Sequence, residues 1–138
     1  MDWQNCLLMS IPVEIDDLEK TIDRYGAVAY LVTTNDDYHP HITHVAVSVQ
    51  SKELICKVGR KTSLNASVRP SVAMLWPPEK PNDYSLIVDG SMQVTEAPDG
   101  SFEGTFLPLS AILHRPASTS VDDLVDECAS DCLSILEK

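Results

Sequence analysis

The stretch LICKVGRKTSLNASVR, residues 54–69, decides the fold and the site that we expect for this chain. Leu54 to Val58 predicts a strand, Gly59 to Ser63 a turn, and Leu64 to Arg69 a short helix. Arg60 and Lys61 are adjacent in the turn. Backbone N–H groups at a helix start, together with two cations, form a site for phosphate. The stretch therefore predicts phosphate binding, and the alternative is a solvated surface turn.

The basic stretch stands out because the rest of the chain is acidic. Five of the ten Lys and Arg residues lie between Lys52 and Arg69, whereas the net charge is −11. Binding to nucleic acid depends on many cations that neutralise phosphates, so this balance argues against a DNA or RNA partner. A cluster of three cations, Lys57, Arg60 and Lys61, suffices for a single phosphate group.

Length and composition predict one domain over residues 1–138. The chain is 43% hydrophobic, which is enough for one packed core. No apolar run approaches the roughly 20 residues of a membrane span. The N-terminus lacks the basic start of a signal peptide, so we expect a cytoplasmic protein without a membrane partner. The four cysteines are interpreted as buried thiols in a reducing compartment, and their spacing does not fit a zinc site.

The pattern along the chain predicts a mainly β protein with a helix at each end. Apolar residues at helical spacing predict helices over about Pro12–Tyr25 and about 120–137. Between the two helices, six runs predict strands: Ala27–Thr34, His41–Val49, Glu53–Val58, Ser71–Trp76, Tyr84–Glu96 and Ile112–Arg115. Asp89-Gly90 predicts a bulge or kink. About six strands in succession predict a closed antiparallel barrel, since closure removes exposed sheet edges.

The histidines of the second predicted strand suggest a metal site by composition alone. His41 and His44 lie on opposite faces of that strand, so they cannot both be close ligands of one metal. We therefore predict no metal. His44 is a candidate proton donor because imidazole titrates near neutral pH, and the alternative is a polar residue that lines a cleft.

Six segments carry a family likeness by their order and spacing: Ala29–Thr34, Pro40–Thr43, Gly59–Thr62 followed by Asn65, Arg69–Trp76, Tyr84–Gly90 and Leu113–Pro116. Together they resemble the pyridoxamine 5'-phosphate oxidase-like family of flavin-binding split barrels, over roughly Tyr25 to Pro116. The resemblance is greatest to a small branch found in actinobacteria, whose members often carry Ser-Asp-Cys near the C-terminus, here Ser130-Asp131-Cys132.

The resemblance implies a split antiparallel β-barrel of the FMN-binding type, with a core over about residues 25–116. It also implies a homodimer with FMN in clefts at the interface. Arg60 and Lys61 would hold the flavin phosphate, with Thr62 and Ser63 as further donors. Contacts along the flavin are implied for six residues of the two preceding strands: His41, Ile42, Thr43 and His44 beside the isoalloxazine ring, and Lys57 and Val58 along the ribityl chain. Trp76, just before two prolines, is expected against the flavin or the dimer partner, or else in the core or in a loop lid.

Departures from the family pattern bear on the function. Pyridoxamine 5'-phosphate oxidases proper carry C-terminal Arg and Trp residues that bind substrate phosphate, and this chain has no counterpart after Arg115. Their second strand begins with Arg and ends with Lys, where this chain has His41 and Ala46. We therefore expect an FMN-dependent oxidoreductase that transfers hydride to or from an unknown small substrate other than pyridoxamine phosphate. The alternatives are a deazaflavin-dependent reductase and a non-catalytic flavin- or haem-binding protein, and no catalytic residue is assigned.

Overall fold

The structure is a computed structural model that describes residues 9–116. Its elements are three helical segments and seven strands: β1 (Ser10–Val13), the 3-10 helix η1 (Ile15–Asp17), α2 (Leu18–Tyr25), β2 (Val28–Thr34), β3 (Pro40–Gln50), β4 (Glu53–Val58), α3 (Arg60–Val68), β5 (Ser71–Trp76), β6 (Ser85–Glu96) and β7 (Phe102–His114). The predicted C-terminal helix, about 120–137, lies outside the described residues. Within residues 9–116, no helix is long and apolar enough to cross a membrane.

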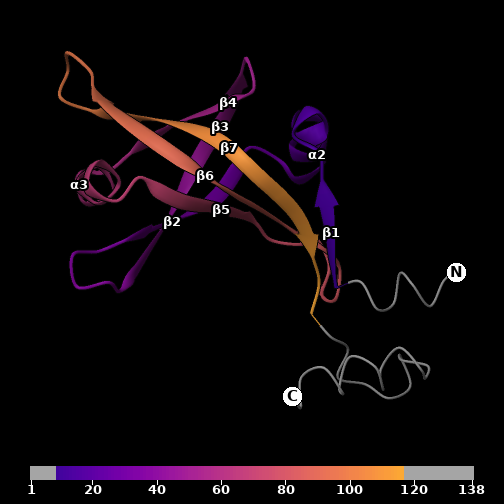
Figure 1. Cartoon of the computed structure of the whole chain (residues 1–138). Helices are drawn as coiled ribbons and strands as arrows, with labels where there is room; N and C mark the ends of the chain where they lie inside the picture. The colour runs from indigo at the N-terminus through magenta and orange to yellow at the C-terminus, as the bar shows by residue number, and fades with distance from the viewer. Residues whose placement is uncertain (1–8, 117–138) are drawn as a thin grey trace, which may run out of the picture.

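Six of the described strands close into an antiparallel barrel (Figure 1). The order of pairing is β7-β4-β3-β2-β5-β6, and β6 pairs back onto β7. The strand β7 carries the closure, because it lies along β6 for its whole length but changes its other neighbour. Its first part pairs with β4 from Phe102 to Phe106, and its last part pairs with β1 from Ala111 to His114. The predicted split barrel with about six strands is confirmed.

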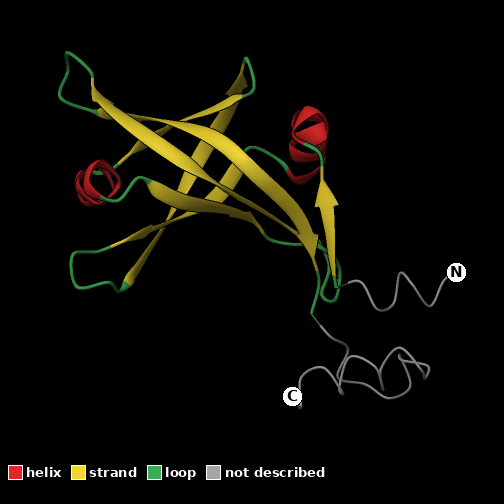
Figure 2. Ribbon diagram, in the orientation of Figure 1, coloured by secondary structure: helices red, strands yellow, loops and turns green. Residues whose placement is uncertain are grey.

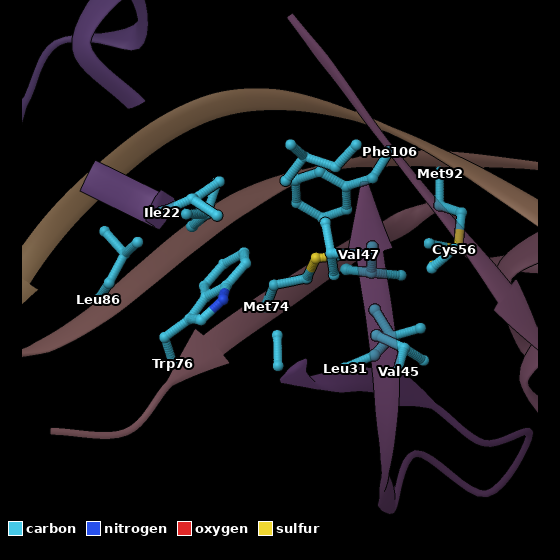
Figure 3. Close-up of a cluster of buried hydrophobic side chains, with 14 of the residues drawn as sticks. Ile22, Leu31, Val45, Val47, Cys56, Met74, Trp76, Leu86, Met92 and Phe106 are labelled. Carbon is cyan, nitrogen blue, oxygen red and sulfur yellow. The ribbon is translucent and has the colours of Figure 1, made fainter. Parts of the chain in front are cut away.

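The core fills the barrel with side chains from alternate strand positions (Figure 3). In β4 the buried residues are Leu54, Cys56 and Val58, while the intervening residues face outward. The same alternation holds in β5, where Val72, Met74 and Trp76 point inward. Successive side chains of a strand point to opposite faces, so each strand gives one row to the core and one to the surface. The largest fully buried apolar side chains are Trp76, Phe106, Leu31, Leu54, Met74, Leu86, Met92 and Val88.

The helices α2 and α3 lie at opposite sides of the barrel (Figure 2). In α2, Leu18 and Ile22 are one turn apart and both are buried, which fixes that helix on the barrel. The helix ends at Gly26, whose φ of 100° lies in the region that favours glycine. In α3 the buried residues are mostly polar, namely Thr62, Ser63, Asn65 and Ala66. This buried polar face distinguishes α3 from an ordinary amphipathic helix. The helix also carries residues of the candidate site described below.

Three boundaries differ from the predictions. The N-terminal helix begins at Ile15 rather than Pro12, because Ser10–Val13 forms β1 against β7. Four residues are too few to show an alternating pattern, and Pro12 is tolerated on an edge strand. The predicted strand Ile112–Arg115 is only the end of β7, which begins at Phe102. Gly104 and Pro108 interrupt the strand pattern of β7 and conceal its length.

The third difference concerns the start of α3. The predicted turn at 59–63 is helical from Arg60 onward, and only Gly59 stays extended. The predicted irregularity at Asp89-Gly90 is confirmed, since the register between β6 and β7 shifts there. At Gly90 a Cβ atom would lie 2.3 Å from the Leu107 carbonyl oxygen, so the close approach of the two strands at the shift requires glycine.

Candidate functional site

The first turn of α3 has two cations and no internal cap. Gly59 is the N-cap residue and has no side chain to accept from the helix, and the first turn contains no acidic residue. The Ser63 amide donates to the Gly59 carbonyl at 2.9 Å, so the preceding N–H groups have no partner within the helix. Cations are unfavourable at the positive end of a helix dipole. An anion bound there is stabilised both by the dipole and by the two cations. This geometry suits a phosphate.

A cavity of about 530 Å³ opens beside this turn. One wall comes from α3 and the other from the hairpin that joins β2 to β3. The lining residues are Asn35, Asp36, Asp37, Arg60, Lys61, Leu64 and Asn65. Arg60 and Lys61 are both exposed, so their charged groups are available to a ligand. The structure thus places the two cations predicted from the sequence beside one open pocket.

Asn65 on α3 and Arg69, the residue that follows the helix, hold the end of β2 and the hairpin. Asn65 Nδ2 donates to Thr33 Oγ1 at 3.1 Å and to Asn35 Oδ1 at 2.8 Å. Arg69 Nε donates to the Thr34 carbonyl oxygen at 2.9 Å, and its Nη2 bonds Asp36 Oδ1 at 2.6 Å. Consecutive residues 33–36 are therefore all bound by α3. We call Asn65, Arg69 and residues 33–36 the clamp.

The hydroxyl groups predicted as further phosphate donors lie on the other side of the helix. Thr62 is 2% exposed and Ser63 is 6% exposed. Neither residue lines the cavity. Their burial between α3 and the barrel follows from helical spacing, because residues next to Arg60 and Lys61 on the chain occupy a different face. The two hydroxyls are therefore not brought together with the cations.

The strand residues predicted along the flavin divide into two groups by direction. Ile42 and His44 of β3 and Lys57 of β4 are exposed and face outward, and Ile42 is 60% exposed. The His44 ring packs edge-to-face on Tyr30 of β2, with centroids 4.6 Å apart. Tyr30 pairs with His44 in the register of β2 and β3, and Lys57 faces outward on β4, the next strand of the sheet. We call Tyr30, Ile42, His44 and Lys57 the outer sheet face.

The other predicted strand residues point inward. His41 and Thr43 are half-buried, on the side of β3 that also carries the buried Val45. Val58 is buried in the core. His41 and His44 therefore point in opposite directions, as the alternation along the strand predicted. Over residues 9–116 there is no group of three His, Cys, Asp or Glu side chains that could hold a metal ion.

Trp76 is a core residue, which corrects its expected contact with a flavin or a dimer partner. The side chain is 0% exposed. Its indole Nε1 donates to the Gly26 carbonyl oxygen at 3.0 Å, at the end of α2. It is surrounded by core side chains such as Met74 and Leu86 (Figure 3). The position before two prolines suggested a lid, but the inward direction at that strand position buries it.

Two titrating groups show the difference between the pocket and the barrel interior. Hydrogen bonds from the His39 amide and side chain lower the pKa of Asp37, and the nearby charge of Lys61 adds to this effect. Burial, and secondly the Glu103 carboxylate, raises the pKa of Cys56 to about 11. Asp37 is therefore ionised at neutral pH beside the cations, whereas the Cys56 thiol is neutral and unsuited to nucleophilic chemistry.

Comparison with known proteins identifies the family. No family model matches this chain. Two curated mycobacterial proteins do match, "Uncharacterized protein Mb0449c" of Mycobacterium bovis and "Uncharacterized protein MT0457" of Mycobacterium tuberculosis. Each is 34% identical over 119 residues, which cover 76% of this chain and 82% of the relative. The chain belongs to the family of these mycobacterial proteins.

Solved structures support the same fold at lower identity. A protein from Listeria innocua described as "Putative Pyridoxamine 5'-phosphate oxidase" has a TM-score of 0.60 at 15% identity, covering 76% of this chain and 100% of its own. The "FAD binding protein" of Mycobacterium smegmatis has a TM-score of 0.51 at 17% identity, covering 76% and 99%. An "F420 Reductase" has a TM-score of 0.52 at 18% identity, covering 62% and 88%. At these identities the likeness concerns the fold alone.

Sequence reasoning missed most of the wall opposite the cations. Asn35, Asp36 and Asp37 of the hairpin wall were given no role, and Leu64 on the α3 wall was interpreted only as part of a short helix. Asn65 entered as part of the family likeness, without a role. A signal existed in the density of polar residues at 35–37, but nothing in the sequence showed that this turn would face the basic stretch about 25 residues later.

Proposed function

We propose that this protein binds FMN, with the phosphate on Arg60 and Lys61 at the start of α3. The observation that carries the proposal is the pair of exposed cations on a helix N-terminus without a side-chain cap, beside a cavity of about 530 Å³. The cations and the free N–H groups supply the charge and the donors that a phosphate monoester requires. The split-barrel fold, shared with flavin-binding proteins, supports the same ligand.

The flavin ring is proposed to lie on the outer sheet face. Tyr30, Ile42 and His44 offer apolar and aromatic surface, and Lys57 offers a cation on the neighbouring strand. Exposed apolar side chains also favour a second copy of the chain, so we propose a homodimer that covers the ring. Val28 and Ile42, which are 58% and 60% exposed, extend this surface on β2 and β3.

The proposed reaction is hydride transfer to or from a small substrate, and a bound flavin would supply this reactivity. The residues of the chain would bind and orient the ring, and the partner would exclude water from it. Lys57 would stabilise negative charge near the ring by its ammonium group. His44 is the proton donor that we propose, held by its contact with Tyr30.

The first experiment is the visible absorption spectrum of the purified protein, followed by titration with FMN. We expect flavin bands or a dissociation constant in the micromolar range or below. The double variant Arg60→Ala/Lys61→Ala should lose at least tenfold in affinity while its circular dichroism is unchanged, since both side chains are exposed. The matched control is Lys20→Ala/Arg24→Ala on α2, which removes the same charge at the opposite side of the barrel and should retain affinity.

Three results would contradict the proposal. A colourless protein that does not bind FMN would show that FMN is not its cofactor. A Soret band in the spectrum would indicate that the cofactor is haem. Equal FMN affinity in the double variant and the wild type would show that Arg60 and Lys61 do not bind the phosphate.

We also propose that the protein works in the cytoplasm, where the thiol of Cys56 stays reduced, and cell fractionation tests this location. Light scattering coupled to gel filtration tests the dimer, which a monomeric mass would contradict.

A further inference from the structure

The cavity beside α3 has walls of opposite charge. Arg60 and Lys61 form one wall, and Asp36 and Asp37 of the hairpin form the other. The Asp36 carboxylate is neutralised by Arg69, at 2.6 Å. The two cations on α3 are thus the only cations that line the cavity in the described part of the chain, and Asp37 opposes them.

The hairpin wall is fixed in place, so the carboxylates do not simply turn away from a ligand. The clamp bonds α3 to residues 33–36, and Asn65 is 5% exposed within it. Asp37 follows directly on the chain. Its Oδ1 accepts from the His39 amide at 3.1 Å, and its Oδ2 lies 3.2 Å from His39 Nδ1. The carboxylate is therefore oriented from both of its oxygens.

Charge counting sets a limit on the ligand. Arg60 and Lys61 supply two positive charges, and a phosphate monoester at neutral pH carries close to two negative charges. A ligand that continues past its phosphate into further carboxylates would carry its next negative charge toward Asp37, the lining carboxylate that Arg69 does not neutralise. Like charges that approach within a partly enclosed site repel each other, and no lining cation remains to compensate.

We propose that Asp37 makes this pocket selective for a flavin that ends in a single phosphate. The pocket rejects a deazaflavin whose phosphate continues into a chain of glutamates. The inference rests on the proposed function and deepens it, because it chooses between the two cofactor classes from residues that the family likeness did not involve.

Three ligands separate the tail from the ring. FMN and 5-deaza-FMN share a terminal phosphate and differ in the ring, whereas the deazaflavin F420 adds the glutamate tail. We expect wild-type protein to bind FMN and 5-deaza-FMN within about threefold of each other and F420 at least tenfold more weakly. We call the ratio of the dissociation constants of F420 and 5-deaza-FMN the gap. Asp37→Asn should narrow the gap by about two- to fivefold, which is the effect of one unit charge near a surface. High salt should narrow it in the wild type.

The variants are matched so that a structural effect is recognised. Asn at position 37 keeps an oxygen that accepts from the His39 amide, so the turn retains that hydrogen bond. Asp23→Asn on α2 changes net charge equally at the opposite side of the barrel and should leave the gap unchanged. Unchanged thermal stability of both variants confirms that only charge has been altered.

Each outcome decides between the proposals. The proposed selectivity is wrong if the gap is unchanged in Asp37→Asn, or if the wild type binds F420 as tightly as 5-deaza-FMN. Neither result contradicts the proposal that the protein binds FMN. Failure of the wild type to bind either phosphate-terminated flavin would overturn the proposed function itself. Binding of F420 alone would overturn both.

Discussion

Asn65 Nδ2 on α3 donates to Asn35 Oδ1 at the end of β2, at 2.8 Å, and thereby fixes the distance between the two walls of the cavity. The two residues are 30 positions apart in sequence. Asn65 also donates to the buried Thr33 hydroxyl, so the amide is shared between the barrel and the hairpin. A helix that carries the proposed phosphate ligands is therefore positioned by side-chain hydrogen bonds in addition to the packing of Ala66 in the core.

Replacing Asn65 by Ala should loosen this attachment. The variant loses two hydrogen bonds at a position that is 5% exposed, and an unsatisfied buried group costs about 1–3 kcal/mol of stability. We expect a lower urea midpoint and FMN affinity at least threefold weaker. Gln93→Ala, which removes an exposed amide on β6, is the control and should change neither property. Wild-type stability in Asn65→Ala would show that the two bonds contribute nothing.

Gly59→Asp should separate stability from binding. Nothing lies within 4 Å of a Cβ placed at Gly59, and its φ of −81° suits any residue. An Asp there would cap α3 and complement its dipole, stabilising the ligand-free protein by a few tenths to about 1 kcal/mol. The same carboxylate would compete with phosphate, so FMN affinity should fall. Thermal melting with and without FMN measures both effects, and a gain in affinity would contradict the proposed phosphate position.

Trp76→Phe should affect the fold and not the ligand. The indole loses its hydrogen bond to the Gly26 carbonyl, and the smaller ring leaves space in a fully buried position. We expect a loss of about 1–3 kcal/mol in unfolding free energy. FMN affinity, measured well below the melting temperature, should stay within twofold. A large loss of FMN affinity in a variant that remains folded would show that Trp76 contributes to the binding site.

The Cys56 thiol should make stability fall at alkaline pH. Its pKa is raised from 9.0 to about 11 in the folded protein, chiefly by burial. Between these values the unfolded chain releases the thiol proton and the folded protein keeps it, so unfolding becomes easier as pH rises from 9 to 11. Urea unfolding of wild type and Cys56→Ala measures this, and the wild type should show the steeper decline, by up to about 1.4 kcal/mol per pH unit. Parallel declines would contradict the burial effect.

The barrel could be predicted from the sequence because its strands follow a simple physical pattern. β4 and β5 were predicted with the observed bounds, since their buried and exposed residues alternate without interruption. β1 and most of β7 were missed for opposite reasons. β1 is a short strand that depends on pairing with β7, and β7 contains Gly104 and Pro108, which are unusual in strands when the partner strand is not known.

The candidate site could be predicted only in part. Arg60 and Lys61 were found because cations in an acidic chain are conspicuous and their order matches a family pattern. Asp37 was not found, because its proximity to Lys61 depends on how α3 crosses the end of the barrel. Trp76 lies in the core, one of the alternatives that the sequence left open, because sequence alone does not fix which face of a strand points inward at its last residue.

The way in which β7 closes the ring also constrains how the chain folds. Most neighbouring strands in the barrel are consecutive in sequence. The pairing of β4 with β7, in which Leu54 lies opposite Phe106, can form only after β7 has been synthesised. Closing so long a loop is entropically costly, and folds dominated by such contacts form slowly. During synthesis the edge of β4 therefore stays open until the last strand emerges. A chain that terminates before Phe102 would keep that edge exposed, and we expect it to aggregate rather than form a smaller barrel.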